Sequence, residues 1–184
     1  MSVSKQIKLI YNSYLSQPSG DRVIYKAIRH TKARRIVECG IGTTQRARRI
    51  IEMAQLVSPD DEIHFTGIDL FEARSAADGP GVSLKLAHRQ LSATGGKIKL
   101  VPGDPLSALA RTANSLGNTD LLVISARQNP DEMAEAWFFV PRILAAEAVV
   151  FEEKPLSGGR MSLQGVSPQE LARRAGENRR SRAA

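Results

Sequence analysis

The sequence contains a single cysteine, Cys39. An intrachain disulfide is therefore impossible, and a cysteine-rich zinc site is excluded. The three histidines, His30, His64 and His88, are far apart along the chain, and none is followed by a second ligand at metal-binding spacing. These residues predict no metal site.

Long apolar segments are missing as well. No hydrophobic run approaches the roughly 20 residues that a membrane-spanning helix needs. Residues 1–10 lack the charged-then-apolar layout of a secretory signal peptide. We therefore expect a cytoplasmic protein with no membrane partner.

The chain does contain enough apolar material for one core. Of its 184 residues, 42% are hydrophobic and 24% are charged, which is typical of a globular domain rather than a disordered chain. The length suits one domain, which we place at residues 1–154. Residues 155–184 are expected to form a basic, weakly structured tail that is dispensable for a cofactor site but not for every partner.

Positive charge is concentrated in this C-terminal part. From residue 153 onward, seven basic and three acidic residues supply four of the seven net positive charges of the chain. A basic tail can attract nucleic acid. We favour a solvated terminus over nucleic-acid binding. Nothing in the sequence sets an oligomeric state.

Short apolar runs alternate with helical stretches from residue 35 onward. Strands are predicted at residues 36–39, 63–69, 98–101, 120–124 and 148–151, with helices between them. This alternation is typical of right-handed βαβ units. The predicted fold is α/β: a doubly wound, Rossmann-like, mainly parallel sheet with helices on both faces.

Further elements are predicted around these strands. Two helices precede the sheet, and the first, over residues 4–16, would carry Ile7, Ile10, Tyr11, Tyr14 and Leu15 on its apolar face. Another helix, over residues 131–144, would pack Trp137 on the sheet. Beyond the fifth strand the pattern fades, with one weak edge strand at 161–166 and a short helix at 168–174.

Residues with functional potential follow the first strand directly. In an open parallel sheet, ligands bind beyond the carboxyl ends of the strands. Glu38 ends the first strand, and Gly40 and Gly42 come next. Glycines allow a tight turn and a close ligand, and the helix after them directs free N–H groups at that ligand. An ordinary strand-to-helix turn also favours glycine, so this loop alone decides nothing.

Two more acids end later strands. Asp69 ends the second strand, where a carboxylate can accept hydrogen bonds from both ribose hydroxyls, and Phe71 beside it could lie against a purine ring. Asp104 ends the third and could receive an exocyclic amine. Each has a plain alternative: an ion pair or cap for Asp69, core packing for Phe71, and a cap for the helix opened by Pro105. Three acids at three successive strand ends favour a nucleotide-type site.

The ordered set of motifs resembles that of class I S-adenosylmethionine-dependent methyltransferases over residues 20–153. Residues 36–42 (IVECGIG) resemble the first motif of that family, 67–72 (GIDLFE) the second, and 103–104 the third. The resemblance implies S-adenosylmethionine as cofactor, with the glycine loop at its methionine part, the second motif at the ribose and the third at the adenine. The implied cofactor-binding residues are Glu38, Gly40, Gly42, Asp69, Phe71 and Asp104.

The sequence departs from the family in three places. Thr44 replaces the third glycine of the usual loop. Residues 120–128 resemble the metal-dependent O-methyltransferase branch, in which an Asp would stand at Ser125 and an Asp-His pair near Arg127 and Gln128. A hard cation needs oxygen ligands, usually carboxylates, so we expect no metal and metal-independent chemistry. The Asn/Asp-Pro-Pro-aromatic signature of amino methyltransferases is also absent.

The expected function is methyl transfer from S-adenosylmethionine to a small-molecule acceptor. No catalytic residue is assigned, although Glu152 and Glu153 end the fifth strand and could face the acceptor. The alternative is a methyltransferase-like domain that has lost catalysis and serves as a binding or regulatory module. A dinucleotide-binding oxidoreductase is a third option, because Asp69 follows Gly42 by about 27 residues, but the glycine pattern is incomplete.

Overall fold

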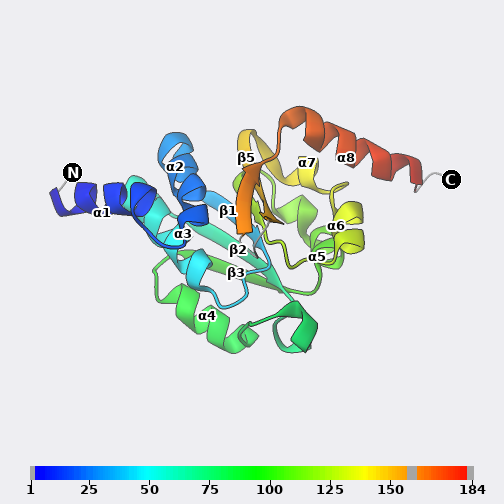
Figure 1. The fold of residues 1–184 in the computed structure, drawn as a ribbon, viewed down its shortest axis with the longest axis horizontal. Helices are drawn as coiled ribbons and strands as arrows, with labels where there is room; N and C mark the ends of the chain where they lie inside the picture. Colours follow the sequence, from blue (N-terminus) through cyan, green and yellow to red (C-terminus); the bar gives the residue numbers. More distant parts are fainter. Residues whose placement is uncertain (1–2, 157–160, 182–184) are drawn as a thin grey trace.

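A six-stranded sheet forms the centre of the computed structural model, which describes residues 3–156 and 161–181 (Figure 1). Its strand order is β3-β2-β1-β4-β5-β6, with the first five strands parallel and β6 antiparallel to β5. The strands are β1 (Arg35–Cys39), β2 (His64–Asp69), β3 (Lys97–Pro102), β4 (Thr119–Ile124), β5 (Leu144–Pro155) and β6 (Met161–Gly165). The predicted doubly wound α/β fold is confirmed.

Helices cover both faces of this sheet. One face carries α2 (Arg22–Thr31), α3 (Gln45–Val57) and α4 (Leu84–Ser92), with α1 (Val3–Tyr14) packed on α2 and α3. The other carries α5 (Pro105–Thr112), α6 (Pro130–Ala136), α7 (Val140–Ile143) and α8 (Pro168–Ser181). Short 3-10 turns lie at Ser19–Asp21 (η1), Phe71–Ala73 (η2), Ala76–Asp78 (η3) and Ala113–Ser115 (η4).

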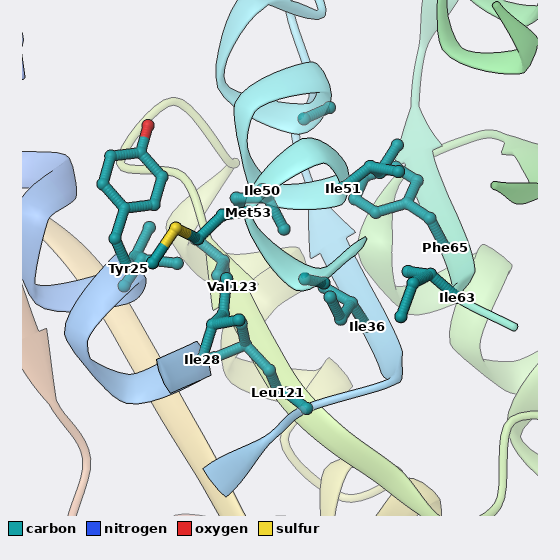
Figure 2. Close-up of a cluster of buried hydrophobic side chains, with 14 of the residues drawn as sticks. Tyr25, Ile28, Ile36, Ile50, Ile51, Met53, Ile63, Phe65, Leu121 and Val123 are labelled. Carbon is teal, nitrogen blue, oxygen red and sulfur yellow. The ribbon is translucent and has the colours of Figure 1, made fainter. Parts of the chain in front are cut away.

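Two cores lie between the sheet and its helical layers. Successive side chains of a strand point to opposite faces. Thus Ile36 joins the first core while Val37 joins the second, and Leu121 and Leu122 divide in the same way. Figure 2 shows the first core, where side chains of α2 and α3 meet those of β1, β2 and β4. Strands buried on both faces explain the near-continuous apolar runs of the sequence.

The carboxyl ends of the strands form the edge at which the helices on the second face begin. Asp104 caps α5, accepting a hydrogen bond from the Ser107 N–H at 2.8 Å, and Pro105 takes the first helical position. Asn129 caps α6 in the same manner, with Pro130 following it. These caps fix the loops after β3 and β4 at the sheet edge where the candidate site lies.

The predicted helix over 131–144 is broken into two pieces. The α6 helix ends at Ala136, and α7 restarts at Val140. Pro141 has no N–H to donate to the Trp137 carbonyl, which disfavours a continuous helix there, and it lies instead in the first turn of α7. Trp137 is buried in the second core, as expected.

The first helix forms as predicted but presents a different face to the protein. Ile7, Ile10 and Leu15 are 62%, 53% and 62% exposed, whereas Leu9 and Ser13 are buried. The inward face meets α2 and α3, and its Asn12 amide lies 3.9 Å from the Met53 sulfur. The predicted apolar stripe is therefore a solvent-facing surface.

The C-terminal part is more ordered than the sequence suggests. β6 pairs with β5 over five residue pairs, and Leu163 is buried in the first core. On α8, Leu171 packs against the second core, and the Arg174 guanidinium lies 4.6 Å from the centre of the Trp137 ring. Two apolar side chains and one arginine thus attach this segment to the domain. The predicted domain boundary at residue 154 falls inside β5. The basic residues from 179 onward lie outside the described side chains.

Candidate functional site

The loop between β1 and α3 contains three residues with left-handed backbone. Gly40 has a φ of +86°, and Gly42 has a φ of +54°, which favours glycine at both positions. The Gly40 N–H donates to the Ile68 carbonyl at 2.8 Å and fixes the loop against the end of β2. Thr44, at the position of the missing third glycine, has a φ of +65° and precedes α3. The predicted glycine loop is a tight turn at the carboxyl edge of the sheet.

Space beside Gly40 is restricted by the segment that follows β4. A Cβ atom at Gly40 would overlap the Gln128 amide and lie 2.9 Å from the Ser125 Cβ. Ser125 is itself held close, because its N–H donates to the Cys39 carbonyl at 2.9 Å. The loops after β1 and β4 therefore meet at a point where only glycine fits.

Glu38 is fully buried beneath this loop. Its Oε1 accepts a hydrogen bond from Arg46 Nε at 2.7 Å, while its Oε2 is buried and has no hydrogen-bond partner among the described residues. Burial raises the pKa of the Glu38 carboxyl above its usual range, and the charge of Arg46 opposes that shift. An unpaired buried acceptor is costly, and Glu38 lines none of the three cavities described below.

Arg46 connects Glu38 to the far side of the site. Its Nη1 donates to Glu153 Oε1 at 2.9 Å. Glu153 Oε2 in turn accepts hydrogen bonds from the Ser125 hydroxyl and the Ala126 N–H, both at 3.2 Å. This network joins β1, α3, β5 and the loop after β4, so the four elements hold the site as a unit.

Asp69 lies at the end of β2 with a side chain that is 1% exposed. Its Oδ2 accepts from the Gly42 N–H at 2.8 Å, and its Oδ1 accepts from the Phe71 N–H at 3.0 Å. Arg74 donates to both oxygens at 2.6 Å in a bidentate pair. The structure thus places Asp69 directly against the glycine loop, and it also gives the carboxylate an arginine partner.

The structure places Phe71 in a hydrophobic core and Asp104 at a helix cap, the structural alternatives that the sequence also allows. Phe71 is 4% exposed and packs in the first core, so its ring is committed to the hydrophobic cluster. Both carboxylate oxygens of Asp104 are engaged by Ser107, through its N–H at 2.8 Å and its hydroxyl at 2.5 Å. Asp104 nevertheless faces the same small cavity as Asp69. The roles predicted for both residues stay predictions.

Three cavities open along this sheet edge. One of about 340 Å³ lies over the glycine loop and is lined by Gly40, Gly42 and Arg46. A second, of about 120 Å³, lies beside Asp69 and Asp104. A third, of about 510 Å³, extends between α6, β5 and α8. The first and third share Ser125 and Glu153, so the Glu153 carboxylate stands between them.

Several residues of this site were missed by sequence reasoning. Arg46 follows Glu38 by eight residues and lies in the first turn of α3, so charge pairing could have suggested it. Arg74 follows Asp69 by five residues in a loop, where no periodic pattern identifies a partner. Asp21, buried at the start of α2, lines the 340 Å³ cavity, and burial raises its pKa.

Neither a metal-binding cluster nor a membrane-spanning helix is found among the described residues. No group of three or more His, Cys, Asp or Glu side chains in residues 3–156 and 161–181 is arranged to hold a metal ion. Among the described helices, none combines the length and the apolar character required to cross a membrane. Metal independence of the chemistry stays a prediction.

Comparison with known proteins gives matches at the level of structure. No protein-family model and no curated sequence matches the chain. Among solved structures, the O-methyltransferase TomG from Streptomyces achromogenes, involved in tomaymycin synthesis and crystallised with S-adenosylmethionine, aligns with a TM-score of 0.58 at 15% identity. The alignment covers 100% of this chain and 79% of TomG. The chain has the class I methyltransferase fold.

Two further structures share the methyltransferase fold. The methyltransferase PaMTH1 from Podospora anserina, solved with S-adenosylhomocysteine, aligns with a TM-score of 0.51 at 13% identity, over 97% of this chain and 75% of PaMTH1. An O-methyltransferase family protein from Burkholderia thailandensis aligns with a TM-score of 0.52 at 15% identity, over 90% of this chain and 44% of that protein. At such identities the likeness defines the fold, and activity must be argued from the site.

Proposed function

We propose that this domain binds S-adenosylmethionine and transfers its methyl group to a small-molecule acceptor. One observation carries the proposal: Asp69 Oδ2 accepts a hydrogen bond from the Gly42 N–H at 2.8 Å. This contact joins the glycine loop after β1 to the acid that ends β2. The two motifs meet where ligands bind in open α/β sheets, and the shared fold with TomG and PaMTH1 supports the same cofactor.

The residues present suit the parts of this cofactor. The unpartnered Oε2 of Glu38, beneath the glycine loop, is the proposed acceptor for the amino group, and Gly40 lines both the 340 Å³ and the 120 Å³ cavity. Asp69 supplies a carboxylate for the ribose hydroxyls, and Asp104 faces the cavity on the adenine side. Gly42 and Phe71 complete the proposed set, Phe71 through the N–H that holds Asp69.

The cofactor, when bound, supplies a methyl group already activated on a sulfonium. The protein then contributes mainly orientation and the exclusion of water. The 510 Å³ cavity is the proposed place of the acceptor, because it adjoins the glycine-loop cavity at Ser125 and Glu153. Its volume lies within the roughly 300–1,000 Å³ of small-molecule sites. Met133 and Trp137 form its apolar wall, and Glu153 is the carboxylate placed to orient an acceptor hydroxyl.

A second candidate is a binding module without catalysis. It is favoured by the loop after β4, where Ser125 to Gln128 offer no carboxylate that could hold a metal ion beside an acceptor. Binding of S-adenosylhomocysteine together with failure to consume S-adenosylmethionine, across phenolic and aliphatic hydroxyl acceptors, would favour this candidate.

Isothermal titration of the full chain with S-adenosylmethionine, S-adenosylhomocysteine and NAD tests the proposal. We expect the first two to bind and NAD not to bind. Asp69→Ala should weaken binding by about 1–3 kcal/mol, because ribose hydroxyls lose a charged acceptor in a buried place. Asp61→Ala is the matched control, since Asp61 precedes β2 at its opposite end and its side chain is 45% exposed. Binding of NAD alone would support a dinucleotide enzyme, and unchanged affinity in folded Asp69→Ala would remove Asp69 from the site.

A further inference from the structure

The carboxylate of Asp69 has no remaining capacity for a ligand. An ionised carboxylate offers about four lone-pair sites on its two oxygens. The N–H groups of Gly42 and Phe71 take one site on each oxygen, and Arg74 takes one more on each at 2.6 Å. Ribose hydroxyls can therefore reach Asp69 only if one pair of donors leaves.

Arg74 is the donor pair that can leave. The two backbone N–H groups belong to the glycine loop and to the residue two places after Asp69, so they stay near it whatever is bound. Arg74 reaches Asp69 from a loop between β2 and α4, in which most residues from 72 to 83 are exposed. Segments with few buried apolar contacts open at low free-energy cost. The guanidinium is thus held by polar contacts on a segment that can move.

Arg74 also separates two of the cavities. The 340 Å³ cavity over the glycine loop and the 120 Å³ cavity beside Asp104 are both lined by Gly40, Arg74 and Arg127. The larger cavity is at the proposed methionine side and the smaller at the adenine side. A nucleoside cofactor that spans both must pass the place where Arg74 meets Asp69.

The loop is folded to accommodate Arg74 in this position. Arg74 Nη1 donates to the Asp78 carbonyl at 2.7 Å. A Cβ atom at Gly81 would overlap the Arg74 side chain, so a glycine at this position leaves the arginine its place. The side chain of Arg74 is only 11% exposed. Arg74 is thus held in one place by the loop around it, unlike a solvent-exposed arginine with a single ion pair.

We propose that Arg74 is a gate on the cofactor site, which sets the affinity for the cofactor by competing with the ribose for Asp69. The inference rests on the proposed function. In the closed state Arg74 fills the ribose place and divides the site. In the open state the loop carries Arg74 away, the two cavities join, and Asp69 keeps its bonds from Gly42 and Phe71. The apparent dissociation constant then equals that of the open state divided by the fraction of molecules that are open.

Titration calorimetry and stopped-flow binding of S-adenosylhomocysteine to the full-length chain test this gate. Arg74→Met removes the competing guanidinium while keeping the length of the side chain. We expect its dissociation constant to fall at least fivefold, with a faster association rate, because the closed state is lost. Arg48→Met, on the exposed surface of α3, is the matched control and should leave both values within twofold of the wild type.

The outcomes separate the gate from the function on which it rests. Equal or weaker binding by folded Arg74→Met, with clear binding by the wild type, would overturn the gate and leave the proposed function standing. Failure of both proteins to bind would overturn both. If Arg74→Met does not fold, Arg74→Lys keeps the charge without the bidentate fork. It should bind more tightly than the wild type by a smaller factor, and equal binding would contradict the gate.

Discussion

Arg46 hydrogen-bonds two carboxylates, those of Glu38 and Glu153, beneath the glycine loop. Arg46→Met would remove this charge and keep most of the apolar contact of the side chain. Glu38, which is fully buried, would then hold a carboxylate without any charged partner. Glu153 would keep the Ser125 hydroxyl and the Ala126 N–H. The stability lost in Arg46→Met should therefore come mainly from the unpaired Glu38 carboxylate.

The size of this effect follows from the burial of the pair. Removing one partner of a buried ion pair costs about 3–5 kcal/mol, because an uncompensated charge remains. The Arg46 and Glu153 side chains are 15% and 16% exposed, so water partly screens them. We expect about 3 kcal/mol at neutral pH. A domain with a free energy of unfolding of roughly 5–15 kcal/mol should still fold after such a loss.

The pH dependence gives a sharper test. Burial raises the pKa of Glu38 above its ordinary 4.5, so the folded chain binds this proton more tightly than the unfolded chain. The free energy of unfolding therefore decreases as the pH rises from about 4.5 through the folded pKa. Loss of Arg46 raises that folded pKa further, so the decrease continues to higher pH. The deficit of Arg46→Met should be small near pH 5 and largest near pH ~8.

Urea unfolding of both proteins across this pH range measures the deficit, provided that the slope with denaturant is unchanged. Loss of Arg46 would also affect Asp21, a second buried acid near Arg46 whose pKa is raised by burial. A control must therefore distinguish Glu38 from Asp21. The double variant Glu38→Gln/Arg46→Met therefore serves as the control. It should regain at least half of the loss at pH ~8. A deficit that is equal at all pH values, or is not relieved in the double variant, would refute the assignment to Glu38.

Gly40→Val should abolish cofactor binding in a chain that still folds. The valine side chain would overlap Gln128, and its left-handed backbone would cost about 1–3 kcal/mol of stability. Calorimetry with S-adenosylhomocysteine checks this prediction, and retained affinity would contradict it. Methyl transfer should persist in excess EDTA, as measured by S-adenosylhomocysteine release; activity lost with chelator and restored by magnesium would show that cation ligands exist elsewhere. A chain ending at Pro155 should unfold more easily by at least about 2 kcal/mol, since Leu163 leaves the first core. It should also bind S-adenosylhomocysteine less well, because Met161 lines the glycine-loop cavity. Unchanged stability and affinity would support the dispensable tail that the sequence predicts.

Sequence periodicity predicted the sheet because each strand follows a local rule. The apolar runs of β1, β2 and β4 are buried on both faces, so their composition alone identified them, whereas the edge strand β3 alternates exposed lysines with partly buried apolar residues. The acids Glu38, Asp69 and Asp104 were placed at strand ends for the same reason. Proximity of Asp69 to the Gly42 N–H then followed from the neighbouring, parallel pairing of β1 and β2.

Contacts between distant segments were beyond such local rules. The tie between Arg46 and Glu153 joins residues 107 positions apart, and nothing in either local pattern selects the other. The α1 helix formed as predicted, yet its periodicity could not reveal that Leu9 and Ser13 face inward while Ile7 and Ile10 face solvent. The pair between Asp69 and Arg74 is local, but it depends on a loop shape that no periodic pattern encodes.

The most direct measurement is a crystal structure of the full chain with S-adenosylhomocysteine. We predict the ribose hydroxyls on Asp69, the amino acid portion beside Glu38 and Gly40, and Arg74 withdrawn from the Asp69 carboxylate. A ligand bound away from the carboxyl ends of β1 and β2, with Gly40 distant from it, would contradict the proposed cofactor site.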